Sequence, residues 1–267
     1  MANPRLSGKT IVITGASSGI GRSTALEFAR SSPNNLKLVL VARRLDRLNT
    51  LAADIAKEVG SAVKVCTVAL DVSKESEACK FIERVPEEFR DIDVLVNNAG
   101  LAKGVAKAPN IPLEDVDVML STNFTGLVNI TQAVLPVFMK RGPSGRGDII
   151  NIGSIAGRES YPTGSIYCAS KAACRAFTDA MRRELISTRI RVIEIDPGQV
   201  ETEFSIVRFG GDAEKAAGVY AGCEPLTPDD VAELVVFAAG RRENVVIADL
   251  LVYPNHQGGA TALHRTL

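Results

Sequence analysis

The chain has 267 residues, a length that fits one large domain or two small ones. Its 31 basic and 31 acidic residues cancel, and aromatic residues make up only 5% of the chain. A nucleic-acid-binding protein needs a positive field or aromatic stacking surfaces, so we expect no nucleic-acid partner. With 46% hydrophobic and 23% charged residues, the composition is that of a folded protein with a full core.

The cysteines and histidines limit the location and the chemistry. Five cysteines form an odd set without a CxxC pair, which favours reduced thiols over a disulfide framework or a zinc site. The two histidines, His256 and His264, lie in the C-terminal tail, so we expect no metal and no Ser-His-Asp triad. No stretch reaches the roughly 18 apolar residues of a membrane span, and neither end carries a targeting pattern. We expect a cytoplasmic protein with no membrane partner.

Short apolar runs alternate with longer amphipathic ones along the whole chain. The short runs predict strands at 10–14, 37–42, 63–69, 93–96, 148–152, 191–195 and 245–252. The longer runs predict helices at 19–30, 47–59, 74–85, 113–140, 165–187 and 228–239. The strands are continuously apolar, which is typical of a parallel sheet covered by helices on both faces. The order predicts a single α/β domain over residues 1–267, doubly wound and Rossmann-type, with a mostly parallel seven-stranded sheet.

One region interrupts this alternation. Residues 198–227 separate a strand from the next helix and contain Gly210, Gly211 and Gly222. Loops of this length in a compact domain are usually lids or binding loops. We therefore expect residues 198–227 to form the substrate-binding loop region.

A glycine-rich turn follows the first predicted strand. Residues 14–21 (TGASSGIG) lead directly into a helix. Glycines let backbone N–H groups approach a pyrophosphate, and the helix N-terminus adds partial positive charge. The turn indicates a dinucleotide site, although a tight turn that needs glycines only for packing would read the same way.

The second strand ends in Arg43 and Arg44, where an NAD site usually places an acid for the ribose hydroxyls. Two guanidiniums suit a 2′-phosphate, which favours NADP, although both could be solvated charges. Asp71, after the third strand, could accept from an adenine amino group or cap the next helix. The fourth strand closes with residues 97–100 (NNAG), which could touch the cofactor or form a plain turn.

Tyr167 and Lys171 are four residues apart, which places both on one face of a helix. An ammonium a few ångströms away favours the phenolate and lowers the pKa of a tyrosine. Ser154 precedes Tyr167 by thirteen residues and could bond a substrate oxygen. Such a pair alone is weak evidence, since a solvated helix face also carries Tyr and Lys.

The glycine turn, residues 97–100, Ser154, the Tyr167–Lys171 pair and Pro197-Gly198 follow one another at predicted strand ends. In this order they resemble the short-chain dehydrogenase/reductase family over essentially the whole chain. The resemblance implies that Tyr167 is the general acid–base, that Lys171 lowers its pKa and binds the nicotinamide ribose, and that Ser154 polarises the substrate oxygen. It also implies that Asn123 holds a water against the lysine and that Val200 and Thr202 meet the carboxamide.

The expected cofactor-binding residues are Gly15, Ser17, Ser18, Gly19, Ile20, Gly21, Arg43, Arg44, Asp71, Asn98, Ala99, Gly100, Tyr167, Lys171, Pro197, Gly198, Val200 and Thr202.

Two stretches, 153–167 and 200–209, are similar to the NADP-dependent 3-hydroxy acid dehydrogenases, nearest the fungal branch that oxidises serine and allo-threonine. The resemblance implies NADP as cofactor, a small-molecule substrate and a homotetramer. A substrate carboxylate needs a cation; we favour Arg208 over Arg158, with a surface pair to Glu201 or Glu203 as the alternative for Arg208. A carbonyl reductase for bulkier substrates and a non-catalytic NADP sensor remain alternatives.

Overall fold

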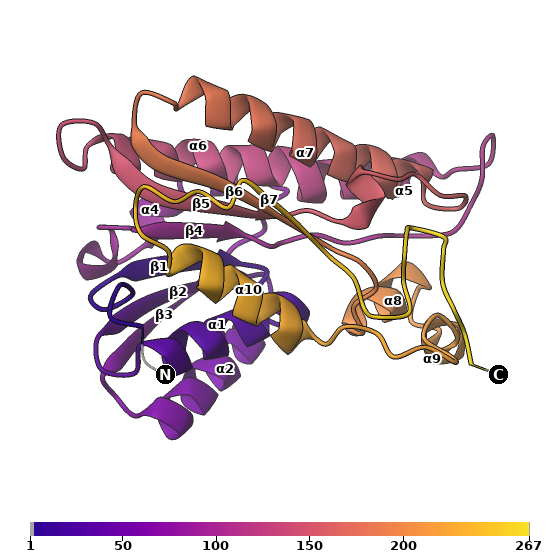
Figure 1. Ribbon diagram of the computed structural model, residues 1–267, viewed down its shortest axis with the longest axis horizontal. Helices are drawn as coiled ribbons and strands as arrows, with labels where there is room; N and C mark the ends of the chain where they lie inside the picture. The colour runs from indigo at the N-terminus through magenta and orange to yellow at the C-terminus, as the bar shows by residue number, and fades with distance from the viewer. Residues whose placement is uncertain (1–2, 267) are drawn as a thin grey trace.

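The computed structural model describes residues 3–266, and within them a seven-stranded sheet lies between two layers of helices (Figure 1). The strand order is β3-β2-β1-β4-β5-β6-β7, and every neighbouring pair is parallel. The expected Rossmann-type α/β fold is therefore confirmed. Residues 1, 2 and 267, which carry part of the expectation about targeting patterns, lie outside the described residues. No helix of the described part is long and apolar enough to cross a membrane.

The strands are β1 Thr10–Thr14, β2 Leu36–Ala42, β3 Val63–Ala69, β4 Val94–Asn97, β5 Arg146–Ile152, β6 Arg189–Pro197 and β7 Asp249–Val252. The longer helices are α1 Gly19–Ser31, α2 Leu45–Val59, α5 Leu113–Leu120, α6 Gly126–Met139, α7 Ser165–Glu184 and α10 Pro228–Ala239. The shorter ones are α3 Glu75–Ala78, α4 Phe81–Arg84, α8 Glu203–Arg208 and α9 Ala213–Gly218.

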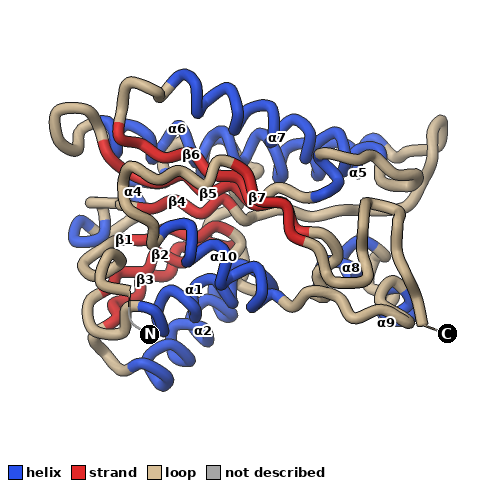
Figure 2. Tube along the Cα trace, viewed as in Figure 1, coloured by secondary structure: helices blue, strands red, loops and turns tan. Residues whose placement is uncertain are grey.

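Both faces of the sheet are buried, as the continuously apolar strands predict. Ile11 and Ile13 of β1 join one apolar core with Val231 and Val235 of α10. Val12, between them, joins the opposite core with Phe138 of α6. Helices α1, α2 and α10 accordingly cover one face, and α4, α6 and α7 cover the other (Figure 2).

Three predicted elements differ clearly from the structure, and the ends of the others shift by at most three residues. The helix expected at 74–85 is two short helices, because three-residue backbone bonds, such as Glu83 N–H to the Lys80 carbonyl at 3.1 Å, interrupt it. The helix expected at 113–140 contains a π turn at Ser121–Thr125. The last strand covers only Asp249–Val252 instead of 245–252; at its expected start the Val245 carbonyl accepts from the guanidinium of Arg191 at 3.0 Å.

The order of the strands places the functional end of the molecule. β2 and β3 follow β1 on one side of it, whereas β4 to β7 follow on its other side, so the order reverses between β1 and β4. In open parallel sheets, ligands bind beyond the carboxyl ends of the strands at such a switch. Helices α8 and α9, within the predicted loop 198–227, lie beyond these ends and beside the C-terminal tail (Figure 1). We call residues 203–218 the α8–α9 lobe.

Candidate active site

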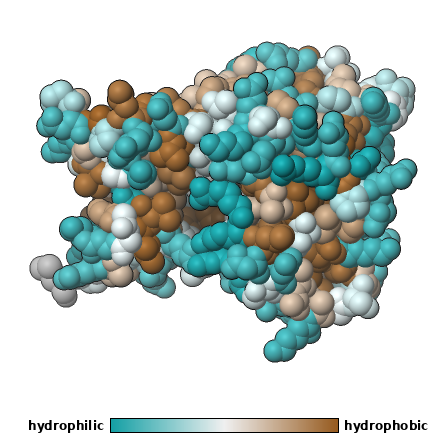
Figure 3. Space-filling model, turned by 180° about the vertical axis from the view of Figure 1, so that it is seen from behind, coloured by the Kyte–Doolittle hydropathy of each residue, from teal (hydrophilic) through white to brown (hydrophobic). Residues whose placement is uncertain are grey.

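A cavity of about 580 Å³ lies at the carboxyl edge of the sheet, between the main body and the α8–α9 lobe. From the side opposite to Figure 1 the molecule is visibly hollowed between its two parts, with hydrophobic side chains deep in the hollow (Figure 3). The expected cofactor residues that line it are Gly15, Ser17, Ser18, Gly19, Ile20, Arg43, Arg44, Asp71, Asn98, Ala99, Gly100, Tyr167, Lys171, Pro197, Gly198, Val200 and Thr202. The fold thus brings these residues, which are distant in the sequence, together around one cavity.

The glycine turn approaches the end of β4 closely. Gly15 has φ +67°, and a Cβ there would lie 2.9 Å from the Ala99 Cα. Gly21, which is not among the described cavity-lining residues, would place a Cβ 2.4 Å from the Asn98 Nδ2. Asn98 donates to the Thr14 carbonyl at 2.9 Å and so fixes the turn. Gly21 therefore serves the packing that the alternative reading foresaw, whereas Gly15 lines the cavity.

The start of α1 is open for an anion. Its N-cap residue, Ser18, makes no side-chain capping bond in the described structure, and the first turn holds no acidic residue. The free N–H groups and the helix dipole of such a terminus attract phosphate. The Ser18 hydroxyl instead accepts a hydrogen bond from Arg44 at 2.9 Å.

Arg44 points back toward the glycine turn and bonds the hydroxyl of Ser17 at 3.0 Å as well. It also pairs with Glu203 of the α8–α9 lobe at 3.2 Å, and Arg47 pairs with the same carboxylate at 2.7 Å. Arg43 is exposed and lines the cavity. The guanidiniums of Arg47 and Arg44 hold the pKa of Glu203 below its usual range. Sequence reasoning missed Arg47, whose partner is 156 residues away.

Asp71 lines the same cavity, but one of its oxygens is already used. The Oδ1 atom accepts from the backbone N–H of Ser73 at 3.0 Å and from its hydroxyl at 2.7 Å. Asp71 thus closes a local turn with Ser73, and the helix cap expected as the alternative is not formed, because α3 begins after Lys74.

Ser154, Tyr167 and Lys171 line the inner part of the cavity. Lys171 is buried and donates to the Ile152 carbonyl at 2.7 Å, and its Nζ lies 5.9 Å from the centre of the Tyr167 ring. Burial raises the pKa of Tyr167 to about 12, and a hydrogen bond with Ser154 opposes the rise. The groups that oppose the rise are Ser154 and Arg208, and the expected lowering by Lys171 is not among the causes of the shift.

Asn123 lies in the π turn of the α5–α6 segment, which turns its side chain away from the ordinary helical register. Its Nδ2 donates to the Leu101 carbonyl at 2.8 Å and to the Ser170 hydroxyl at 3.0 Å. A Cβ on Gly100 would lie 3.3 Å from the Asn123 Oδ1 and 3.7 Å from the Lys171 Nζ. Asn123 thus approaches Lys171 across Gly100, although it is behind the described cavity lining.

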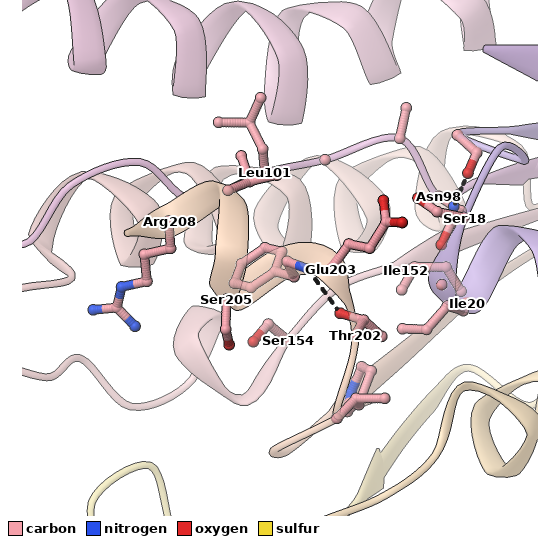
Figure 4. A pocket seen from close by; sticks show the side chains of 18 of the residues that line it. Ser18, Ile20, Asn98, Leu101, Ile152, Ser154, Thr202, Glu203, Ser205 and Arg208 are labelled. Carbon is pink, nitrogen blue, oxygen red and sulfur yellow. Dashed lines mark hydrogen bonds between the residues drawn. The ribbon is translucent and has the colours of Figure 1, made fainter. Parts of the chain in front are cut away.

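Arg208 lines the cavity, whereas Arg158 does not belong to its described lining. The guanidinium of Arg208 lies 5.6 Å from the centre of the Tyr161 ring and bonds only weakly to Thr163, at 3.3 and 3.4 Å. Its Nε is buried without a partner among residues 3–266. The surface pair with Glu201 or Glu203 is not formed. Ser154, Ser205 and Arg208 lie toward one end of the cavity, and Ser18, Ile20 and Asn98 toward the other (Figure 4).

Arg158 is engaged elsewhere, which argues against the second expected substrate contact. It pairs with Asp196 at 2.6 Å and also with Asp249. Sequence reasoning chose it for its closeness to Ser154 in the chain, but the 3₁₀ turn Ile155–Gly157 directs it to β6. Cavity-lining residues that the sequence did not single out include Gln199, Ser205, Tyr220, Gln257 and Arg265.

Comparison with known proteins agrees with this geometry. The family model described as short chain dehydrogenase matches residues 9–209. An NADP-dependent 3-hydroxy acid dehydrogenase of Schizosaccharomyces pombe is 54% identical over 98% of both chains. A serine 3-dehydrogenase of Rhizobium radiobacter is 40% identical over 94% of this chain and 96% of its own. A solved structure, the closed form of serine dehydrogenase complexed with NADP+, is 38% identical, covers 96% of this chain and 99% of its own, and superposes with a TM-score of 0.85. The chain belongs to the short-chain dehydrogenase family.

Proposed function

We propose that this protein is an NADP-dependent dehydrogenase of small 3-hydroxy acids such as serine and allo-threonine. The observation that carries the proposal is one cavity that holds Arg44 at one end, Ser154, Tyr167 and Lys171 within, and Arg208 at the other end. The names of the relatives with 54% and 40% identity support the same reaction class and substrate class.

The residues present fit NADP. The open N-terminus of α1 and the glycine turn suit a pyrophosphate. Arg44, already held toward this turn by Ser17 and Ser18, suits the 2′-phosphate, with Arg43 and Arg47 beside it. Asp71, Asn98, Val200 and Thr202 line the same cavity. When bound, the nicotinamide supplies the hydride acceptor or donor.

Tyr167 is the group that moves the proton. Its phenolate oxygen accepts the proton of the substrate hydroxyl during oxidation, and its hydroxyl donates the proton back during reduction. A tyrosine with a pKa near 12 is almost wholly protonated at neutral pH, so cationic charge close to it is needed to make the phenolate available. Lys171 is the resident cation on the same helix face, and Asn123 braces the segment 100–101 against it. Ser154 bonds both Tyr167 and the substrate oxygen.

Arg208 is the proposed partner of the substrate carboxylate. Among the described residues, the Nε of Arg208 has no partner, and its guanidinium makes only long bonds to Thr163. The guanidinium is therefore available to bind a carboxylate of the substrate. The aromatic ring of Tyr161 lies against it and limits its movement. Residues 198–227, which include the α8–α9 lobe, are accordingly the proposed substrate-binding region.

We further propose a cytoplasmic homotetramer. Large apolar side chains remain exposed at Leu113 of α5 (79%), at Phe237 of α10 (46%) and at Ile186 in the turn after α7 (82%). Such surfaces favour contacts with further copies of the chain. The five cysteines are free thiols, which suits a reducing compartment.

A substrate panel tests the proposed function. Initial rates are measured with NADP+ and NAD+ against L-serine, allo-threonine, 3-hydroxybutyrate, 1-propanol and a steroid alcohol. The proposal expects the highest kcat/KM for a hydroxy acid with NADP+. A faster reaction of an uncharged or bulky alcohol, or equal use of NAD+, would contradict it.

A further inference from the structure

Two carboxyl groups lie buried directly behind the active site. Glu194 and Asp196 are two residues apart on β6 and so point to the same face of the sheet. Their residues are only 3% and 1% exposed. Neither belongs to the described lining of the cavity, and neither was singled out by the sequence. Buried carboxyl groups need partners, so the contacts of this pair indicate what they do.

Asp196 accepts a hydrogen bond from the backbone N–H of Ser154 at 2.9 Å. This is the only hydrogen bond of that N–H within residues 3–266. The neighbouring amide, of Gly153, bonds the Ile195 carbonyl. The other oxygen of Asp196 accepts from Arg158 at 2.6 Å and from Arg175 at 3.3 Å. One oxygen of the Asp196 carboxylate thus binds Ser154, and the other binds the two arginines.

The arginines are themselves fixed from the far side. Asp249 of β7 pairs with Arg175 at 3.0 Å and also with Arg158. Asp249 therefore shares both arginines with Asp196, but it has no described contact with Ser154. This difference makes Asp249 a matched control for any effect of Asp196.

Glu194 does not add a second negative charge at neutral pH. Burial and the neighbouring Asp196 raise the pKa of Glu194 to about 8, while Arg175 of α7 and Arg158 oppose the rise. The protonated carboxyl of Glu194 can then bond Asp196. The pair carries one charge, which the arginines balance.

The backbone before Ser154 is fitted to this arrangement. A Cβ on Gly153 would lie 1.8 Å from the Asp196 Oδ1 and 2.8 Å from the Glu194 Oε1. On the other side, Lys171 holds the Ile152 carbonyl at 2.7 Å. The segment 152–154 is therefore held from one side by the lysine of the active site and from the other by Asp196.

We propose that Asp196 is a positioning residue for the dehydrogenation: it fixes Ser154 through its backbone N–H, with Arg158 and Arg175 holding the carboxylate in place. The inference rests on the proposed function, in which the Ser154 hydroxyl bonds Tyr167 and the substrate oxygen. A misplacement of about 1 Å at such a group costs up to about 100-fold in rate. Asp196 touches neither substrate nor cofactor and acts only through Ser154.

The kinetic test uses Asp196→Asn, Ser154→Ala, the double variant and the control Asp249→Asn. With NADP+ and L-serine, or the best acid of the panel, Asp196→Asn should lower kcat about 10- to 100-fold. Its KM for NADP+ should change by less than about twofold, because the phosphate end of the cavity is untouched. Asp249→Asn should keep kcat within about twofold. The double variant should be no slower than Ser154→Ala.

Two kinetic results would overturn the inference. One is an Asp249→Asn enzyme as slow as Asp196→Asn, which would mean that the arginine cluster only stabilises the fold. The other is an Asp196→Asn loss that multiplies the Ser154→Ala loss, since the two residues would then act independently.

The rate of hydrogen exchange at the Ser154 amide tests the inference without any substrate. In the unmutated protein the Ser154 amide should exchange slowly, and in Asp196→Asn it should exchange at least about tenfold faster than in Asp249→Asn. If the Ser154 amide of the unmutated protein exchanges like an unprotected loop amide, the inference is wrong, and this holds even where Asp196→Asn does not fold. A wild-type enzyme inactive on the whole panel would refute the proposed function alone, because the exchange result is independent of turnover.

Discussion

Replacing Arg44 with alanine should weaken NADP+ binding while sparing NAD+. A charged hydrogen bond to phosphate contributes about 1.5–3 kcal/mol. Part of this is offset, because Arg44 must give up Glu203; their side chains are 41% and 45% exposed, and such exposed pairs contribute about 0.5 kcal/mol. The net loss is about 1–2.5 kcal/mol, or roughly 5- to 70-fold in the dissociation constant.

The assay is a fluorescence titration of the protein with NADPH and NADH. Arg47→Ala is the matched control, because Arg47 contacts the same carboxylate of Glu203 but neither Ser17 nor Ser18. Arg44→Ala should weaken NADPH binding by the stated factor, change NADH binding by less than twofold, and exceed the effect of Arg47→Ala. Equal losses for NADPH and NADH would refute the reasoning, since Arg44 would then support the glycine turn rather than bind the phosphate.

Three further changes have defined outcomes. Arg208→Ala should lower kcat/KM for serine about 10- to 100-fold and leave 1-propanol nearly unchanged, as one charged bond predicts; equal losses in steady-state rates would mean that Arg208 only holds the α8–α9 lobe. Glu194→Gln should flatten the pH dependence of the free energy of unfolding. A carboxyl group whose pKa rises to about 8 on folding stabilises the folded protein fully at pH values below the pKa of an ordinary glutamate. It loses that contribution as the pH rises through 8. Urea midpoints from pH 5 to 9 check this, and parallel curves for both proteins would contradict it. Gly21→Ala should impair folding or cofactor binding, because its Cβ would lie 2.5 Å from the Gly15 carbonyl oxygen; a thermally unperturbed variant with native NADPH affinity would contradict it.

Local spacing was enough to predict much of the site. The glycine turn and the Tyr167–Lys171 pair each depend on geometry within a few residues of one strand end or one helix, so the sequence predicts their side-chain arrangement directly. The alternation of buried strands and helices predicts the doubly wound parallel sheet, but it does not by itself specify the strand order. The π turn at Asn123 could not be predicted in this way, because a 3.6-residue apolar period continues on both sides of it.

Contacts between distant segments could not be read from the sequence. Arg158 lies four residues after Ser154, yet the fold commits it to Asp196 and Asp249 on two later strands. The Glu203 carboxylate reaches Arg44 and Arg47 only once the α8–α9 lobe is placed against the end of β2. Tertiary packing decides these pairs, and neither partner carries a local signal.

The rate of NADPH formation from NADP+ and L-serine, in the unmutated protein and in Tyr167→Phe, tests the central claim most directly. The substitution keeps the ring, which packs edge-on against Phe204 at 5.4 Å between centres, and removes only the proton-transferring hydroxyl. The account predicts a loss of about 100- to 10,000-fold in kcat with NADPH binding unchanged. A Tyr167→Phe enzyme with nearly native kcat would contradict it and would point to Tyr161 as the acid–base.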